Sequence, residues 1–135
     1  MEELIIEAKI DKLDEVLEFV NRILEANEVP MKATMQIDIA VEEVFVNIAH
    51  YAYDKDNGMA TIRADILNDP KAVSFTFIDE GMAYNPLEKK DPDVTLSAED
   101  RQIGGLGIYM VKKTMDDVKY EYIDGKNSLT ISKCF

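Results

Sequence analysis

Several common protein classes are disfavoured by what this sequence lacks. Its single cysteine, Cys134, excludes an internal disulfide and a cysteine-rich metal site. Acidic residues outnumber basic ones by 27 to 15, which gives a formal net charge of −12. A general nucleic-acid binder shows a basic face, and a protein that docks on anionic membranes needs basic clusters, so we expect neither. The sequence also has no run of about 18 apolar residues that could span a bilayer.

The composition fits an ordinary folded domain. With 135 residues, of which 47% are hydrophobic and 31% charged, the chain is long enough for one core and too apolar for a disordered protein. Its acidic, alternating start resembles neither a signal peptide nor a transit peptide. We therefore expect one globular domain over residues 1–135, located in the cytoplasm.

The most informative stretch runs from Ile37 to Tyr53. Its apolar residues recur at alternating steps of four and three, which predicts one buried face of a helix. These apolar residues are Ile37, Val41, Val44, Ile48 and Tyr51. Glu43 and Asn47 lie four residues apart, so they share one side of this helix, next to the apolar face. A carboxylate and an amide at the border of a core are costly unless they face something polar, so we expect them to face a ligand.

Two further helices and five strands are expected around this central helix. One helix should run from an N-cap at Asp11 to about Asn27, and another over Ile103–Met115. The predicted strands are Leu4–Ile10, Ala60–Leu67, Ala72–Ile78, Val118–Ile123 and Ser128–Ser132. The intervening stretch Asn85–Gln102 shows little periodicity, and a loop of that length often forms a lid. Most strands are hairpin-linked and the helices are clustered, which favours an α+β two-layer α/β sandwich with helices on one face of a mixed, mostly antiparallel sheet.

A glycine-rich motif opens the last predicted helix. Gly104, Gly105 and Gly107 would leave several N–H groups pointing outward at the positive end of the helix dipole, which suits phosphate. Taken alone, the same glycines fit a hinge or a tight helix–sheet contact equally well. A Rossmann fingerprint fails because position 110 is methionine and a polar loop precedes the glycines, and no Walker Gly-Lys-Ser/Thr sequence exists.

Two shorter patterns each have an ordinary structural explanation and a functional one. Asp79 and Gly81 end a strand, where a carboxylate can accept a hydrogen bond from an exocyclic amine and a glycine admits a flat ring, although a simple turn is the commoner explanation. Asn47 could supply one oxygen to a Mg²⁺ shared with a triphosphate, and Glu43 could accept a proton from an attacking hydroxyl. The alternative for this pair is a solvated helix flank. His50 is more often a packed side chain than a ligand, so we assign it no catalytic role.

Together, the three motifs resemble those of one family. They are Glu-x-x-x-Asn within "EEVFVNIAHYAY", Asp-x-Gly within "FIDEGMAYNP" and Gly-Gly-Leu-Gly within "GGLGIYMVKKTMDDVKYEY". In this order they resemble the ATPase superfamily of gyrase, heat-shock chaperone, histidine kinase and mismatch-repair proteins. Within it, the chain is most similar to the bacterial anti-sigma factor serine/threonine kinases, over Met35 to Tyr122. The resemblance implies a single histidine-kinase-like ATPase domain with the Bergerat fold, which binds ATP and Mg²⁺.

The resemblance assigns roles around the phosphates of ATP. Glu43 would be the catalytic base and Asn47 the Mg²⁺ ligand. The lid and the glycine motif would hold the phosphates, with Arg101 near the γ-phosphate or the partner. The residues of the glycine motif are Gly104, Gly105, Leu106 and Gly107.

The resemblance also assigns an adenine site. Asp79 with Gly81 would read adenine, and Thr130 on the last strand would support this site. The chain departs from the family where Tyr51 replaces a frequent histidine and where Tyr84-Asn85-Pro86 replaces Phe-Asp-Pro. Both departures bear on the partner more than on ATP.

The resemblance further implies partners and an activity. Such proteins sequester a sigma factor, phosphorylate a serine or threonine of a STAS-type anti-anti-sigma protein, and are commonly homodimers. One alternative is a non-catalytic ATP-dependent protein-binding module, which would have no need for Glu43. Another is the catalytic fragment of a histidine kinase, which usually has asparagine at the position of Glu43. Gyrase-like ATPases keep the glutamate but need a long additional transducer domain.

Overall fold

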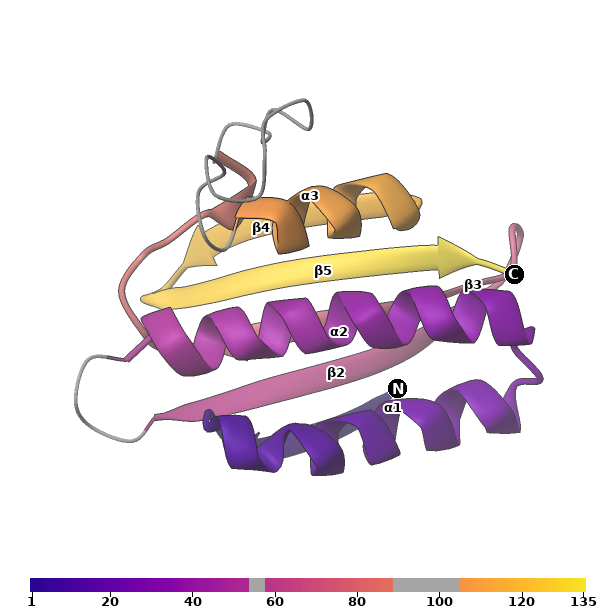
Figure 1. Cartoon of the computed structure of the whole chain (residues 1–135), viewed down its shortest axis with the longest axis horizontal. Coiled ribbons are helices and arrows are strands. Elements are labelled where there is room, and N and C mark those ends of the chain that lie inside the picture. The colour runs from indigo at the N-terminus through magenta and orange to yellow at the C-terminus, as the bar shows by residue number, and fades with distance from the viewer. Residues whose placement is uncertain (54–57, 89–104) are drawn as a thin grey trace.

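The computed structural model describes residues 1–53, 58–88 and 105–135. In this part of the chain, helices cover one face of a five-stranded sheet (Figure 1). The helices are α1 (Leu13–Ala26), α2 (Met31–Tyr51) and α3 (Gly105–Thr114), with short 3₁₀ turns η1 (Ile10–Lys12) and η2 (Pro86–Glu88). The strands are β1 (Glu2–Glu7), β2 (Met59–Leu67), β3 (Ala72–Asp79), β4 (Asp117–Ile123) and β5 (Lys126–Cys134). The predicted two-layer α+β sandwich is therefore confirmed.

The strand order is β1-β2-β3-β5-β4, and every pairing is antiparallel. The sheet was expected to be mixed and mostly antiparallel, and the described strands contain no parallel pair. β1 and β2 are joined through helices, so they could have been parallel. Because α1 and α2 run in opposite directions between them, the chain re-enters the sheet at the end where β1 finished (Figure 1). β2 then has to run against β1.

The central helix α2 buries the face that the periodicity predicts. Ile37, Val41, Val44 and Ile48 are all buried, together with Phe45. Tyr51 was predicted to be buried as well, but this prediction was wrong: Tyr51 is 49% exposed. Tyr51 is the last residue of α2, and its ring lies 6.2 Å from that of Tyr84, centroid to centroid, at the edge of the sheet.

The start of α1 differs from the prediction. The chain forms η1 after β1, so the expected strand Leu4–Ile10 ends at Glu7. Asp11 lies inside η1 and does not cap a helix; α1 begins after Lys12, whose side chain makes no capping bond. The backbone N–H of Lys12 donates instead to the carbonyl of Lys9, at 3.0 Å. The 3₁₀ turn thus takes over the hydrogen bonding that a cap would have supplied.

The core lies between α2 and the covered face of the sheet. Its largest fully buried side chains include Phe45 of α2, Phe75 and Phe77 of β3, and Ile62 of β2. Burying each such side chain contributes about 1.5–3 kcal/mol, so the pairing of α2 with β2 and β3 accounts for much of the stability. This rigid contact fixes where the polar residues of α2 lie.

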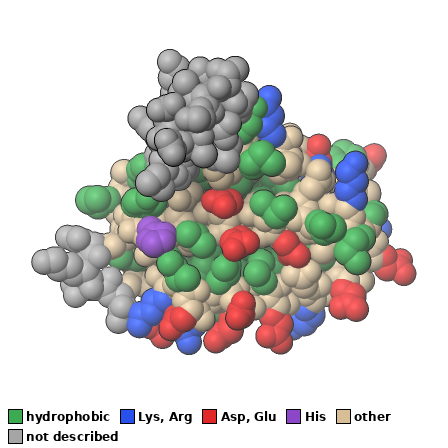
Figure 2. Space-filling view, in the orientation of Figure 1, with side chains coloured by type: hydrophobic (Ala, Val, Ile, Leu, Met, Phe, Trp, Pro, Cys, Tyr) green, Lys and Arg blue, Asp and Glu red, His purple; other side chains and the backbone are tan. Residues whose placement is uncertain are grey.

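The outer side of the helix layer carries apolar and acidic groups. Met31, Met35 and Ile39 of α2 are exposed, and hydrophobic and acidic side chains lie next to one another on this side (Figure 2). No helix among the described residues has both the length and the apolar character needed to cross a membrane.

Candidate functional site

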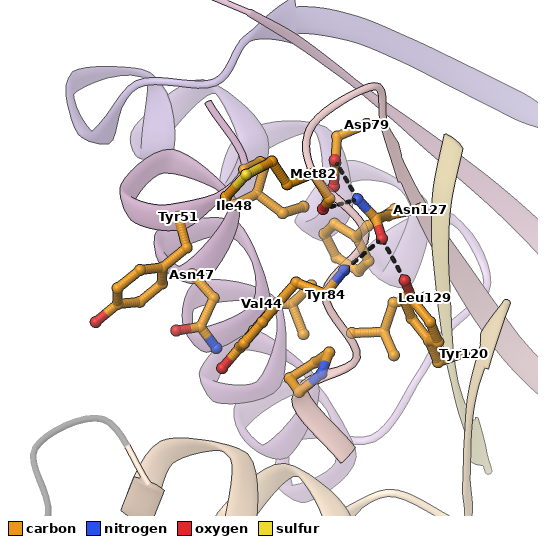
Figure 3. A pocket seen from close by; sticks show the side chains of 13 residues that line it. Val44, Asn47, Ile48, Tyr51, Asp79, Met82, Tyr84, Tyr120, Asn127 and Leu129 are labelled. Carbon is orange, nitrogen blue, oxygen red and sulfur yellow. Dashed lines mark hydrogen bonds between the residues drawn. The ribbon is translucent and has the colours of Figure 1, made fainter. Parts of the chain in front are cut away.

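A pocket opens where the C-terminal half of α2 meets the end of β3 and the start of β5. Its apolar wall includes Val44 and Ile48 of α2, and its polar groups include Asn47, Asp79 and Asn127 (Figure 3). Asp79 and Asn127 are brought together because they are paired in the antiparallel register of β3 and β5. The structure thus places two of the three sequence motifs, those containing Asn47 and Asp79, at one pocket.

Asp79 forms a buried carboxylate at this pocket. The residue is only 5% exposed, and its Oδ1 accepts the backbone N–H of Gly81 and the amide of Asn127, both at 2.9 Å. A buried carboxylate is costly unless it is hydrogen-bonded, and these two donors meet that requirement. The arrangement presents a fixed acceptor at the end of an apolar slot.

Gly81 has a packing role. A Cβ at this position would lie 2.0 Å from the carbonyl oxygen of Ala52, at the C-terminal end of α2. The next backbone N–H, that of Met82, donates to the same carbonyl at 3.2 Å. The glycine therefore lets the turn after β3 approach the backbone of α2, whereas the sequence had suggested the approach of a flat ring.

Glu43 connects the central helix to the start of α3. A Cβ on Gly107 would lie 2.0 Å from Glu43 Oε2, so only glycine allows the first turn of α3 to come this close to the carboxylate. Because Glu43 lies one helical turn before Asn47, the start of α3 is adjacent to the pocket. The third motif therefore joins the other two on the same side of the molecule.

The environment of Glu43 favours its protonated form. Burial raises the pKa of the Glu43 carboxyl above its ordinary value of 4.5, and the neighbouring charge of Glu42 raises the pKa further. A carboxylate with a raised pKa is a better proton acceptor at neutral pH than an ordinary one, provided that it remains ionised. The direction of this pKa shift is the one that a general base at neutral pH requires.

Some of the expected phosphate-binding residues are not described. Arg101 and Gly104 lie outside the described residues. Gly105 is the first residue of α3, followed by Leu106, whose side chain is not described. A phosphate role for these residues remains a prediction.

Thr130 does not lie at the pocket. Its hydroxyl is hydrogen-bonded to that of Thr76, its partner across β3 and β5, at 2.9 Å. Successive side chains of a strand point to opposite faces, so Thr130 and the buried Leu129 lie on opposite sides of the sheet. Leu129 lines the pocket, which places Thr130 on the face that the helices leave open.

The residue that lies at the pocket in its place is Asn127, which directly precedes the predicted strand Ser128–Ser132. Between β4 and β5, Asp124 and Gly125 have positive φ, at 54° and 75°, as in the two-residue turn that Asp-Gly favours. β5 therefore resumes at Lys126, and Asn127 is already a strand residue. The Asp-Gly signal, combined with the alternation through Leu129, could have identified Asn127 as a strand residue on the same face as Leu129, but not its pairing with Asp79.

Asn127 links β5 to the chain that follows β3. Its amide nitrogen donates to Asp79 Oδ1 and, at 2.8 Å, to the carbonyl of Met82. Its amide oxygen accepts the backbone N–H of Tyr84 at 3.1 Å and the hydroxyl of Tyr120 (Figure 3). One buried side chain thus holds both Asp79 and the wall formed by Met82 and Tyr84.

The room in the pocket is small. The cavity volume is about 40 Å³, against roughly 300 Å³ or more for typical ligand sites. Since Asn127 ties the backbone of Met82 and Tyr84, the space for a purine has to come mainly from rotation of their side chains, and Met82 is 75% exposed. An adenine could then lie on the apolar wall with Asp79 at its edge.

The described residues include no cluster of three or more His, Cys, Asp or Glu side chains that could hold a metal. Asn47 offers a single amide oxygen at the pocket. One or two protein oxygens are what Mg²⁺ usually takes when phosphates supply further ligands. The donor set therefore fits a magnesium ion that is shared with a bound nucleotide.

This fold and this pocket define a two-layer domain in which helices cover one face of an antiparallel sheet and border a pocket at the strand ends. Residues 6–133 match the family model described as "Histidine kinase-like ATPase domain", so the chain belongs to that family. The resemblance inferred from the three motifs is thereby confirmed.

Curated relatives give the closer context. The chain is 28% identical over 96 residues to the serine/threonine-protein kinase BtrW of Bordetella bronchiseptica, covering 71% of this chain and 67% of the relative. It is 30% identical over 93 residues to the anti-sigma F factor of Caldanaerobacter subterraneus subsp. tengcongensis, covering 69% and 64%. It is 31% identical over 99 residues to the serine-protein kinase RsbW of Listeria monocytogenes, covering 70% and 62%. The chain thus matches only about two thirds of the length of these relatives.

A solved structure supports the fold. The chain is similar to one in the crystal structure of the SiaB–SiaC complex from Pseudomonas aeruginosa, with a TM-score of 0.52 over 98% of this chain and 89% of that one. The sequence identity is 15%, so this likeness concerns the fold alone.

Proposed function

We propose that this chain is an ATP-binding serine/threonine protein kinase of the anti-sigma factor type. It sequesters a sigma factor and phosphorylates a STAS-type anti-anti-sigma protein. The observation that carries this proposal is the convergence of Asn47 and Asp79 on one pocket, with Glu43 one turn away against Gly107. The names of the curated relatives, which include serine kinases and an anti-sigma factor, support it.

The nucleotide is held by groups from three elements. Asp79 accepts a hydrogen bond from the exocyclic amine of adenine, and Asn47 contributes one oxygen to Mg²⁺. The start of α3, from Gly105 to Gly107, offers backbone N–H groups at the positive end of the helix dipole to the phosphates. Gly104 and Arg101 are proposed to extend this phosphate site. Bound ATP·Mg²⁺ supplies the phosphoryl group.

Glu43 handles the proton of the acceptor. When a serine or threonine hydroxyl of the partner lies beside the carboxylate, an oxygen of Glu43 receives its proton as the hydroxyl oxygen becomes a nucleophile. The raised pKa of Glu43 makes this transfer more favourable. The contact with Gly107 keeps the carboxylate next to the phosphate end of the site, so positioning contributes as well.

The proposal also covers the domain organisation, location and oligomeric state of the protein. We propose that residues 1–135 act as one domain in the cytoplasm and that the chain forms a homodimer. The net charge of −12 suits a protein partner with basic groups and disfavours direct binding to nucleic acid or to anionic membranes.

The decisive experiment uses γ-labelled ATP. The protein is incubated with Mg²⁺ and with purified STAS-type proteins encoded by neighbouring genes, and label is expected on a serine or threonine of one of them. Stabilisation by ATP·Mg²⁺ in a melting assay without any labelled partner would favour the non-catalytic binding module. A lack of any stabilisation would contradict ATP binding, and equal stabilisation by ATP and GTP would contradict the role of Asp79.

A further inference from the structure

Asn127 has no hydrogen-bonding capacity left for a ligand. The side chain is almost fully buried, and its nitrogen donates to the Asp79 carboxylate and to the Met82 carbonyl. Its oxygen accepts from the Tyr84 backbone and the Tyr120 hydroxyl. An amide has two donor hydrogens and an oxygen with two lone pairs, so all four positions are filled. Asn127 can therefore influence a ligand only through the groups that it holds.

These bonds also fix the orientation of the Asn127 amide. If the amide were reversed, its oxygen would face the Asp79 carboxylate and the Met82 carbonyl, and one of its N–H groups would face the backbone N–H of Tyr84. Only the Tyr120 hydroxyl could adapt, because a hydroxyl can also accept. Three mismatched contacts would be very unfavourable. The nitrogen of Asn127 is therefore held firmly against Asp79.

As a consequence, the two carboxylate oxygens of Asp79 have different roles. Oδ1 accepts from Gly81 and from Asn127, whereas no hydrogen bond to Oδ2 is found among the described residues. No buried side-chain oxygen or nitrogen in this part of the chain lacks a partner, so Oδ2 is not sealed off and remains accessible. Because Oδ1 is fixed twice, the direction of Oδ2 is fixed as well, and Asp79 lines the pocket.

We propose that Asn127 is a positioning residue for adenine selectivity. By holding Oδ1 of Asp79, it directs Oδ2 to the place where the exocyclic amine of adenine is recognised, and it makes no contact with the nucleotide. This inference rests on the proposed binding of ATP. On β5, Thr130 had been expected to support the adenine site. The inference gives that supporting role to the buried amide of Asn127 on the same strand.

The test compares the affinities for ADP and inosine diphosphate, measured by calorimetry in Mg²⁺. Inosine diphosphate carries an oxygen where adenine carries the amine, so it cannot donate to Oδ2. We expect the unmodified protein to prefer ADP by at least about tenfold, as one hydrogen bond to a charged group provides. In Asn127→Ser the preference should fall to within about twofold, through loss of ADP affinity with little change for inosine diphosphate.

The matched control is Thr76→Val, which removes the Thr76–Thr130 hydrogen bond from the same pair of strands on the opposite face of the sheet. It should keep the full preference for ADP. Asp79→Ala should abolish the preference, and adding Asn127→Ser to Asp79→Ala should then change the ratio no further. If Asn127→Ser does not fold, Tyr120→Phe removes one donor to the Asn127 oxygen and should lower the preference by about two- to fivefold.

The outcomes separate this inference from the proposed function. If ADP binds and Asn127→Ser (or Tyr120→Phe in its place) keeps the preference, Asn127 does not act through Asp79 and the inference is overturned. An equal loss of both nucleotides would reduce Asn127 to a structural residue and also overturn it. If the unmodified protein binds ADP and inosine diphosphate equally, the role of Asp79 fails while nucleotide binding stands. If it binds no nucleotide, the proposed function fails and the inference fails with it.

Discussion

The two faces of β5 differ in chemistry and in role. On the helix-covered face, Asn127, Leu129 and Ile131 are buried, and the first two line the pocket. On the open face, Thr130 is only half-buried. The Thr130 hydroxyl is hydrogen-bonded to the hydroxyl of Thr76. A shift of one residue along a strand exchanges the faces completely. The position of a polar residue within the alternation, and not its type alone, therefore decides whether it belongs to the site.

The largest expected effect comes from the helix side, at Glu43. Glu43→Gln should reduce phosphoryl transfer by at least about 10², because the amide cannot accept the proton of the acceptor hydroxyl. ATP affinity should stay nearly unchanged. Single-turnover transfer of label measures the rate of phosphoryl transfer, and nucleotide titration measures the ATP affinity. Glu42→Gln is the matched control, since Glu42 is the exposed neighbour of Glu43. Removing its charge lowers the pKa of Glu43 and should reduce transfer only slightly; equal losses in the two variants would remove the proposed base.

A smaller effect is expected at Asn47. Asn47→Ala removes one proposed Mg²⁺ ligand, so the gain in ATP affinity on adding Mg²⁺ should fall by about tenfold or more, whereas affinity in EDTA should not change. Titrations with and without Mg²⁺ measure this difference. Should the variant keep the whole magnesium-dependent gain, Asn47 would not be the ligand.

On the open face, Thr130→Val should affect stability and leave the nucleotide site intact. The variant loses the hydrogen bond to Thr76, which should lower the free energy of unfolding by about 1 kcal/mol. Urea unfolding measures this loss, and the ADP affinity should equal that of the unmodified protein. A clear drop in ADP affinity would show that the two faces of β5 do not have separate roles.

The smallest expected effect concerns the pH dependence of stability. The pKa of Glu43 is raised in the folded state, above its ordinary value of 4.5, so ionising Glu43 costs more in the folded chain than in the unfolded one. This penalty is present above the folded-state pKa and absent below about 4.5. Glu43→Gln should therefore raise Tm slightly at pH 7, and the gain should disappear near pH 4. A gain that stays constant over this range would contradict the raised pKa.

Much of the fold could be predicted because its signals are local. The periodicity of α2 identified Ile37, Val41, Val44 and Ile48 as core, and the alternation of β2 and β3 identified a hairpin that the structure contains. The start of α1 was wrong because the 3₁₀ turn at Ile10–Lys12 satisfies its backbone without a cap from Asp11. A cap is favoured by residue type, but a neighbouring turn can replace it.

The site was predicted in its outline and missed in its details. Motif spacing identified Glu43, Asn47 and Asp79, which the structure brings to one region. It could not identify Asn127, because the pairing of Asn127 with Asp79 joins positions 48 residues apart. Such a contact follows from the sheet register and not from any local pattern.

The place of β5 in the sheet affects how the domain assembles. β5 follows all the other strands in sequence, yet it lies between β3 and β4. Until residues 126–134 are inserted, β3 is paired only with β2 and β4 has no partner strand, so the order in which a ribosome delivers the strands is not their order in space. The pocket is therefore among the last parts of this fold to form. Removing β5 would separate β3 from β4 and divide the sheet, whereas removing an edge strand would only narrow it.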